Sequence, residues 1–218
     1  MGIRRAATII LALLIDYWLG DPPNRFHPVA YMGRAIEWAE RRAPPPRHRW
    51  HQFSYGAGLV LGGAWSVFRL GRLAELVISR LPILPGWLAE AILLKTVISL
   101  SGLLRAAGQI RRALEMNDVP EARRLTSWHL VSRDTSQLTA SQVAAATIES
   151  LAENASDGIV APLCYYTLGG LPAALAYRFV STCDSMLGYH DPVHEWLGKA
   201  SARLDDLINL VPARLTAG

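Results

Sequence analysis

Three carboxylates recur at helical spacing in the second half of the chain. Glu149, Glu153 and Asp157 lie four residues apart, so on a helix they form one acidic stripe. Like charges at this spacing repel, and the predicted helix contains no Lys or Arg to offset them. Carboxylates beside Asn154 suit Mg²⁺, a hard cation that prefers oxygen ligands. The stripe therefore predicts a magnesium site, with a solvated acidic face as the alternative.

A second group of acids stands near the end of the sequence. Asp205 and Asp206 are adjacent, and on a helix they point about 100° apart, so both cannot face one ligand squarely. Asp205 and Asn209 lie four residues apart and can share a face. Arg203 and Arg214 flank them and either bind phosphate or pair locally with the acids. An aspartate-rich helix of this kind fits a magnesium–diphosphate ligand, which indicates a nucleotide or phosphate substrate.

Further candidates lie where the chain leaves apolar sequence. Gly20 and the prolines around it fix an irregular backbone that would hold Asp21 and His27 in defined positions. Asp184 follows the end of an apolar segment, and an acid at such a boundary more often has a function than not. A turn with interfacial polar residues is the alternative for the first of these stretches.

One more polar stretch precedes a clear helix start. Arg133 and Asp134 come shortly before Thr139 and Gln142, which have the spacing of a capping box. The helix that begins there runs through alanine-rich sequence to about residue 156 and carries the acidic stripe.

Apolar segments must position these groups. Residues 1–19, 53–68 and 81–104 are predicted membrane helices, and the glycines of the second would allow close packing. The third contains Glu90 and Lys95, which are costly in lipid unless they face the protein interior. A long amphipathic helix on the membrane surface is the alternative for that segment.

A fourth apolar segment covers residues 158–183 and is interrupted by Gly169, Gly170 and Pro172. These residues break a helix, and each half of about 11 residues, or about 16 Å, is too short to cross alone. We expect a re-entrant helical hairpin, with a single kinked span as the alternative. The predicted fold is all-α: one polytopic membrane domain over residues 1–218, with amphipathic cytoplasmic helices.

Composition and charge agree with a membrane protein. The 218 residues are 51% hydrophobic and 18% charged, which argues against disorder, and the mean hydropathy is +0.18. The net charge of +4 comes from Arg residues spread through the loops 20–52 and 105–157, not from a basic tail. The positive-inside rule places both loops in the cytoplasm, so we expect an inner-membrane protein without a nucleic-acid partner. Cys164 and Cys183 read as buried free thiols.

No Walker A loop, GxGxxG, HExxH, GxSxG or cysteine-based zinc pattern occurs in the sequence, so phosphate binding would use Arg side chains and metal. Two other classes compete with this interpretation. A prenyl- or alcohol-phosphotransferase predicts paired Asp-x₃-Asp words, to which the acidic stripe is the near match. A transporter or non-catalytic membrane subunit predicts polar residues within spans, for which Glu90 and Lys95 are the support.

The polar stretches together resemble the adenosylcobinamide-phosphate synthase family of cobalamin biosynthesis. The matching words, in order, are LGDPPNRFHPV, SRDTS, ESLAENASDGIVAPL, CDSMLGY and ARLDDLINLVPARLTA. The resemblance implies a membrane enzyme that joins (adenosyl)cobyric acid to aminopropanol or its phosphate, with ATP and Mg²⁺. Because a carboxylate is a poor acyl donor, ATP would activate it as an acyl phosphate before the amine attacks.

The resemblance also suggests roles for the residues in these words. Asp21 and His27 would form a substrate-site pair, and Asp184 would join them. Arg133 and Asp134 would be further catalytic residues, with Arg133 placed against phosphate. The other phosphate and nucleotide candidates are Asn154, Arg203 and Arg214, and the metal candidates are Glu149, Glu153, Asp157, Asp205 and Asp206.

The chain departs from the family at two places. Ser181 stands where the family has Asn, and the sequence stops at Gly218, before the further membrane sequence and the Ser-Pro-Asn-Ala-Gly-Trp-Pro-like motif of the family. We therefore expect the C-terminal part to be missing or supplied by another polypeptide. Other membrane proteins of the same pathway are further expected partners.

Overall fold

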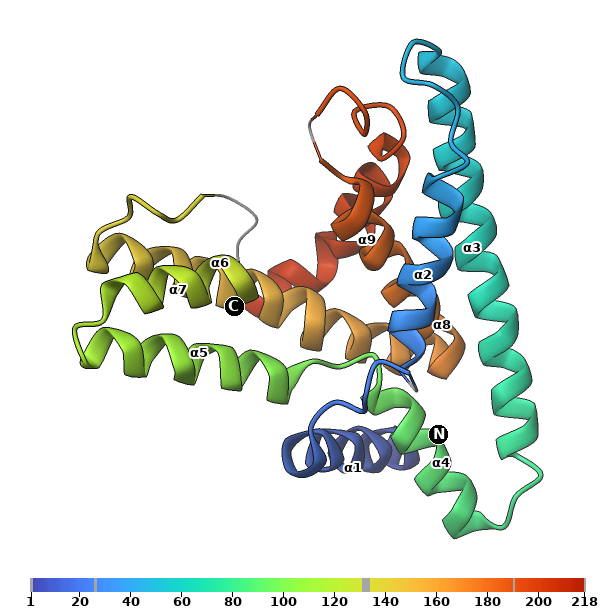
Figure 1. The fold of residues 1–218 in the computed structure, drawn as a ribbon. Coiled ribbons are helices and arrows are strands. Elements are labelled where there is room, and N and C mark those ends of the chain that lie inside the picture. The colour runs from blue at the N-terminus through green and yellow to red at the C-terminus, as the bar shows by residue number, and fades with distance from the viewer. Residues whose placement is uncertain (1, 26, 131–133, 190, 218) are drawn as a thin grey trace.

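The structure is a computed structural model that describes residues 2–25, 27–130, 134–189 and 191–217. Within these residues the elements are helices and turns without a strand, which confirms the predicted all-α class (Figure 1). The helices are α1 (Gly2–Leu19), α2 (Pro28–Glu40), α3 (Arg49–Ile78), α4 (Ile83–Lys95), α5 (Leu100–Glu115), α6 (Val119–His129), α7 (Ala140–Ala155), the π-helical turn η1 (Ser156–Val160), α8 (Ala161–Leu187) and α9 (Lys199–Ala217).

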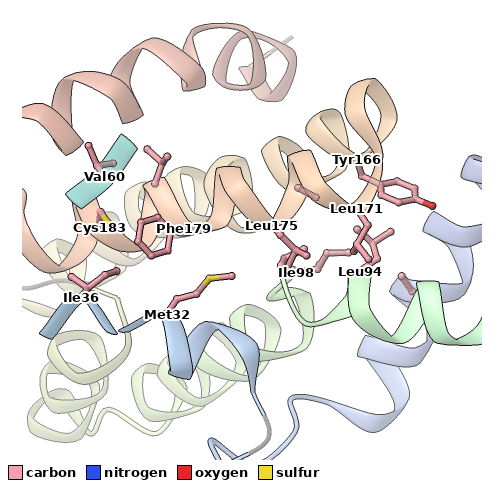
Figure 2. Close-up of a cluster of buried hydrophobic side chains, with 14 of the residues drawn as sticks. Met32, Ile36, Val60, Leu94, Ile98, Tyr166, Leu171, Leu175, Phe179 and Cys183 are labelled. Carbon is pink, nitrogen blue, oxygen red and sulfur yellow. The ribbon is translucent and has the colours of Figure 1, made fainter. Parts of the chain in front are cut away.

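The helices pack around two separate hydrophobic cores. The larger core is built mainly on α8, and Figure 2 shows Leu171, Leu175 and Phe179 of this helix among side chains from α2, α3 and α4. The smaller core lies between α5, α6 and α7 and is centred on Ile110 and Val143. Figure 1 shows these three helices stacked together to one side of the others. The chain therefore forms two groups of helices, each with its own apolar interior.

Local sequence explains where several helices begin. The side chain of His27 accepts a hydrogen bond from the backbone N–H of Val29, which caps α2. Thr139 and Gln142 form the predicted capping box at the start of α7, each accepting from the other's backbone N–H. The prediction of a helix from this point to about residue 156 is confirmed.

The long helix α8 reverses direction at Gly170. This residue has φ 72° and ψ −164°, a conformation that is essentially restricted to glycine. The hydroxyl of Tyr177 lies 3.3 Å from the backbone oxygen of Asp157, and the rings of Tyr165 and Tyr177 stack with centroids 5.0 Å apart. On a straight helix, residues 20 apart would be about 30 Å apart. The predicted helical hairpin is therefore confirmed, and a single kinked span is excluded.

Polar side chains from three other helices hold the tip of the hairpin. Glu75 of α3 accepts a 3.2 Å hydrogen bond from the N–H of Leu171, which the break at Gly170 leaves without a helical partner. Glu90 of α4 accepts a 2.6 Å hydrogen bond from the hydroxyl of Tyr166, and Arg5 of α1 donates to the carbonyl of Thr167. The tip is therefore fixed by hydrogen bonds as well as by apolar packing.

The prediction of one continuous helix over 81–104 is wrong. The chain bends by 42° between α4 and α5, in the break formed by residues 96–99. At this break the N–H of Ser99 donates a 3.0 Å hydrogen bond to the carbonyl of Gly158, and buried Lys95 turns toward α1. These contacts outside the helix replace the hydrogen bonds that would continue it.

The described residues contain one helical stretch, Ala140–Leu187, that is apolar and long enough to cross a membrane, and a second if α4 and α5 count as one span. The first of these stretches includes the hairpin, so its chain returns rather than running straight. The helices predicted at 1–19 and 53–68 form as α1 and as part of α3. Their multi-pass arrangement in a membrane stays a prediction.

Glycines in α3 meet neighbouring elements closely, as predicted. A Cβ at Gly56 would overlap the backbone oxygen of Leu197, and a Cβ at Gly63 would overlap the ring of Phe179. These two glycines let α3 lie directly against α8 and the segment that follows it.

Candidate functional site

A polar cavity of about 830 Å³ lies between the two groups of helices. Side chains of α6 and α7 line one wall, and side chains of α8 line the other. Ser99 and Gly158, which hydrogen bond to each other through their backbones, lie on the lining where the two walls meet. Its charged lining residues are Glu149, Glu153, Asp157, Arg178 and Asp184, and Asn154 lies among them.

The acidic residues of the cavity act on one another. Asp157, Asp184 and Asp205 come from η1, α8 and α9, and the hairpin brings them into electrostatic contact. Burial raises the pKa of Asp205 to about 7, and the negative charges of Asp184 and Asp157 add to this effect. These acids therefore lie close enough to disfavour one another's ionised forms.

The π-helical turn places Asp157 at the base of the hairpin. Single π-helical turns inside helices occur frequently at functional sites. Gly158 in this turn faces Ser99 closely enough that a Cβ would overlap the Ser99 hydroxyl. In this turn Asp157 lines the cavity. The next residue, Gly158, accepts the hydrogen bond from Ser99 in the break between α4 and α5.

A chain of hydrogen bonds fixes Asp205 of α9 behind the cavity wall that α8 forms. Asn209 donates a 2.8 Å hydrogen bond to Asp205, and Tyr177 donates a 2.9 Å hydrogen bond to Asn209. The other oxygen of Asp205 is buried and has no hydrogen-bond partner among the described residues. A buried acceptor without a partner costs free energy, so this oxygen is suited to a proton or a cation.

Arg178 is a component of the site that the sequence argument missed. It lines the cavity from the returning arm of the hairpin, which is the part of α8 after Gly170. Its Nε is buried without a hydrogen-bond partner in the described part of the chain. The charges of Asp21, Asp157 and Asp205 act on it. One signal was available: a lone arginine within an apolar membrane segment marks a functional position.

A second polar group lies where α1 ends. The Nε2 of His27 lies 3.7 Å from Asp21, and Lys95 lies 3.9 Å from Asp21 and 3.6 Å from fully buried Asp16. The contact with His27 is the main reason that the pKa of Asp21 lies below its usual value, and Lys95 and Arg105 reinforce it. Asp21 is therefore a carboxylate at neutral pH.

The described residues hold no group of three or more His, Cys, Asp or Glu side chains placed to ligate one metal ion. Mg²⁺ in phosphate-binding sites is commonly held by one or two carboxylates, water and the substrate's own phosphate oxygens. The cavity fits that manner of binding, because it offers several carboxylates and the unpartnered oxygen of Asp205.

Comparison with known proteins identifies the family. Residues 9–218 match the family model described as CobD/Cbib protein. The chain belongs to the CobD/CbiB family. This confirms the resemblance inferred from the five sequence words, which lie in order along the matched region.

Relatives in the family are named for cobalamin biosynthesis. The cobalamin biosynthesis protein CobD of Dehalococcoides mccartyi is 45% identical over 95% of this chain and 67% of its own length. The CobD of Halalkalibacterium halodurans is 41% identical over 95% of the chain and 64% of its own length, and the CbiB of Salmonella arizonae is 39% identical over 94% and 65%. The chain thus spans about two thirds of the length of the curated relatives it matches. No solved structure matches it.

The fold brings together fewer than half of the thirteen site residues predicted from these family words. Five of them line the cavity: Glu149, Glu153, Asn154, Asp157 and Asp184. The other candidates that the structure describes do not line the cavity, although Asp205 and Asp206 interact electrostatically with Asp184, which does.

The exposed candidates have local partners instead. Arg203 pairs with Asp206 at 3.7 Å, and both side chains are exposed, while the charge of Asp206 also acts on Asp184. Arg214 donates to a carbonyl of its own helix. Asp134 is exposed and accepts hydrogen bonds from the backbone and hydroxyl of Ser136, which tie the turn before α7. Arg133 lies outside the described residues.

Glu90 and Lys95 face the protein interior, as their cost in lipid predicted. Glu90 pairs with Arg4 at 2.9 Å and with Tyr166, while Lys95 pairs with Asp16 and donates to the carbonyl of Gly20. Both residues are engaged in fixing helices to one another.

Proposed function

We propose that this chain carries the polar site of an ATP- and Mg²⁺-dependent synthase of cobalamin biosynthesis. The reaction joins the carboxylate of (adenosyl)cobyric acid to the amine of aminopropanol or its phosphate. The observation that carries this proposal is the convergence of residues from separate family words on one cavity of about 830 Å³. The names of the relatives support the pathway, and the oxygen-rich lining of the cavity supports the proposed chemistry.

The reaction needs an activated acyl group, because a carboxylate resists attack by an amine. Transfer of the terminal phosphoryl group of ATP to the carboxylate oxygen would give an acyl phosphate and ADP. The amine nitrogen then bonds to the acyl carbon, the C–O bond to phosphate breaks, and the nitrogen loses a proton. Bound Mg²⁺ would offset phosphate charge during these steps.

The cavity's own residues support a division of roles. Asp157 and Asp184, with Asp205 behind them, would hold Mg²⁺ together with phosphate oxygens. Glu149 and Glu153 on the opposite wall would extend the oxygen-rich surface toward the substrate. The η1 turn and the hairpin keep these groups in place before a ligand arrives, which lowers the cost of binding.

Membrane attachment agrees with the same function. We propose that the hairpin 158–183 enters the bilayer from the cytoplasmic side, so that its base, with Asp157 and Asp184, faces cytoplasmic ATP. Arg-rich loops at 20–52 and 105–157 favour that orientation. The corrinoid, the amine and lipid are then the immediate partners, with other membrane proteins of the pathway or a separate C-terminal segment completing the site.

The test is amide synthesis in a strain that cannot convert cobyric acid to cobinamide. It compares this chain alone with a fusion of this chain to the C-terminal third of the Dehalococcoides mccartyi relative. Asp157→Asn, at the base of the hairpin, should lower cobinamide formation at least tenfold in whichever of the two proteins is active. Glu115→Gln is the control, because Glu115 pairs with Arg111 on an exposed face of α5. Failure of both unmutated proteins, or full activity of Asp157→Asn, would overturn the proposal.

A further inference from the structure

The returning arm of the hairpin carries a cation into the acidic cavity. Among the described residues that line the cavity, Arg178 is the one Lys or Arg side chain. Ser181 and Ser185 follow it at helical spacing and line the same cavity. The guanidinium therefore lies on the helix face that looks toward a ligand.

Arg178 is not held by an ion pair. No described carboxylate lies within 4.0 Å of it, although Asp21, Asp157 and Asp205 act on it from further away. Arg124, by comparison, lies 2.7 Å from Glu121 on α6. An arginine whose role is to neutralise neighbouring acids would be expected to contact them in the same way.

The buried Nε donor of Arg178 lacks an acceptor among the described residues. A guanidinium has five N–H groups, and its Nε is buried without a partner in the described part of the chain. Leaving a charged donor unpaired in a buried place is costly, so the arrangement is suited to an acceptor that arrives with a ligand. The planar fork of a guanidinium matches two oxygens of a phosphate group.

We propose that Arg178 binds a phosphate group of a substrate in this cavity. This inference rests on the proposed function, which supplies two phosphate-bearing ligands, ATP and phosphorylated aminopropanol. The carboxylates around the cavity repel a free phosphate, so a phosphate there needs both Mg²⁺ on the acids and a cation of the protein. Arg178 supplies that second contact from the wall formed by α8.

The test compares Arg178→Met and Arg178→Lys with Arg111→Met, a control whose exposed side chain pairs with Glu115. In the active protein, whether the chain alone or the fusion, KM is measured separately for Mg-ATP, for aminopropanol phosphate and for aminopropanol. Arg178→Met should raise KM for one phosphate-bearing substrate roughly tenfold to a hundredfold, the equivalent of one charge-assisted hydrogen bond. Arg178→Lys should show a smaller increase, and KM for unphosphorylated aminopropanol should stay within twofold.

The two phosphate-bearing substrates distinguish the sources of the phosphate. An increase confined to Mg-ATP assigns Arg178 to the nucleotide, and one confined to aminopropanol phosphate assigns it to the amine substrate. Equal changes for aminopropanol and its phosphate, with no change for Mg-ATP, would overturn the inference. So would unchanged KM values for all three ligands.

Direct binding separates this inference from the proposed function. Calorimetric titration of the purified chain with Mg-ATP and with aminopropanol phosphate needs no turnover, and Arg178→Lys keeps the charge if Arg178→Met does not fold. The inference is supported if the wild-type chain binds one of these ligands and a variant of Arg178 binds it at least tenfold more weakly. This result counts even where no amide forms. Equal affinity of folded Arg178→Lys and Arg178→Met chains to the wild type would refute it.

Discussion

The hydroxyl of Tyr177 donates a 2.9 Å hydrogen bond to the side-chain oxygen of Asn209, and both groups are buried. The same hydroxyl lies 3.3 Å from the backbone oxygen of Asp157. Tyr177 thus joins the returning arm of the hairpin to α9 and to the π-helical turn. Three elements that carry candidate site residues meet at one phenolic oxygen.

Removal of this oxygen should loosen the site. Tyr177→Phe leaves Asn209 without its donor, and a buried unpaired group costs about 1–3 kcal/mol. The melting temperature in detergent should fall measurably, and Mg-ATP affinity should fall with it because Asp205 loses its fixed neighbour. Tyr31→Phe is the control, since Tyr31 is exposed and donates to a backbone carbonyl. Equal melting temperatures for the two variants would contradict this role.

The reversal of the hairpin should depend on a glycine at position 170. Gly170→Ala places a Cβ 2.5 Å from Glu75 in a backbone conformation that costs about 1–3 kcal/mol for other residues. Thermal unfolding should show a clear loss of stability. Gly58→Ala provides the comparison, because Gly58 lies within α3 with no heavy atom within 4 Å of the added Cβ. That variant should match or exceed wild-type stability, since Ala favours a helix interior.

Removing the charge of Lys95 alone should destabilise the fold more than removing the charges of Lys95 and Asp16 together. Lys95→Met leaves fully buried Asp16 with an uncompensated charge, which typically costs about 3–5 kcal/mol. Adding Asp16→Asn should recover a large part of the loss, because the charge is removed while an acceptor for the N–H of Ser101 remains. Unfolding midpoints of the single and double variants provide the measurement. A double variant no more stable than Lys95→Met would count against the pair.

The matched lysine for this comparison lies on the surface. Lys199 lies 3.5 Å from Glu195, and both side chains are more than one-third exposed. Exposed pairs contribute about 0–1 kcal/mol, so Lys199→Met should shift the midpoint far less than Lys95→Met.

The segment between α8 and α9 should respond to pH through His194. Burial alone would lower its pKa, but hydrogen bonds of 2.9 Å to Glu40 and 2.6 Å to Asp191, with the charges of both, raise the pKa above 6.5. A raised histidine pKa stabilises the fold fully below pH 6.5 and loses that contribution as pH rises through the folded pKa. Wild-type stability should therefore exceed that of His194→Gln most near pH 6.

Melting temperatures between pH 5.5 and pH 9 check this behaviour. The difference between wild type and His194→Gln should shrink as pH rises. The pKa of Asp191 lies below its usual value because of its hydrogen bond to His194. The contribution of Asp191 to the stability of the fold is therefore lost only under acidic conditions. A difference that stays constant across the range would rule out titration of His194 as the cause.

Local patterns in the sequence predicted the parts of this fold that depend on local chemistry. The capping box at Thr139 and the reversal at Gly170 follow from turn and cap preferences of neighbouring residues, and both are present. The interior position of Glu90 follows from its cost in lipid, and its partners Arg4 and Tyr166 confirm it.

Other features depend on contacts between distant segments, which local patterns do not contain. The break at residues 96–99 replaces a predicted continuous helix because Ser99 bonds to Gly158, 59 residues later in the sequence. Arg178 was overlooked because its neighbours in the sequence are apolar and read as part of a span. Its importance becomes visible only when the hairpin turns it toward acids of η1 and α9.

The hydrogen bond between Ser99 and Gly158 has a mechanical consequence. The covalent chain passes between the two cores at two places, the break before α5 and the π-helical turn after α7, and this bond ties the two together. Together with the hydrogen bond from Ser101 of α5 to Asp16 of α1, these attachments resist sliding and twisting, and the easiest relative motion is rotation about the line through them. Swinging of α5, α6 and α7 about this axis would widen or narrow the cavity while both apolar interiors stay intact.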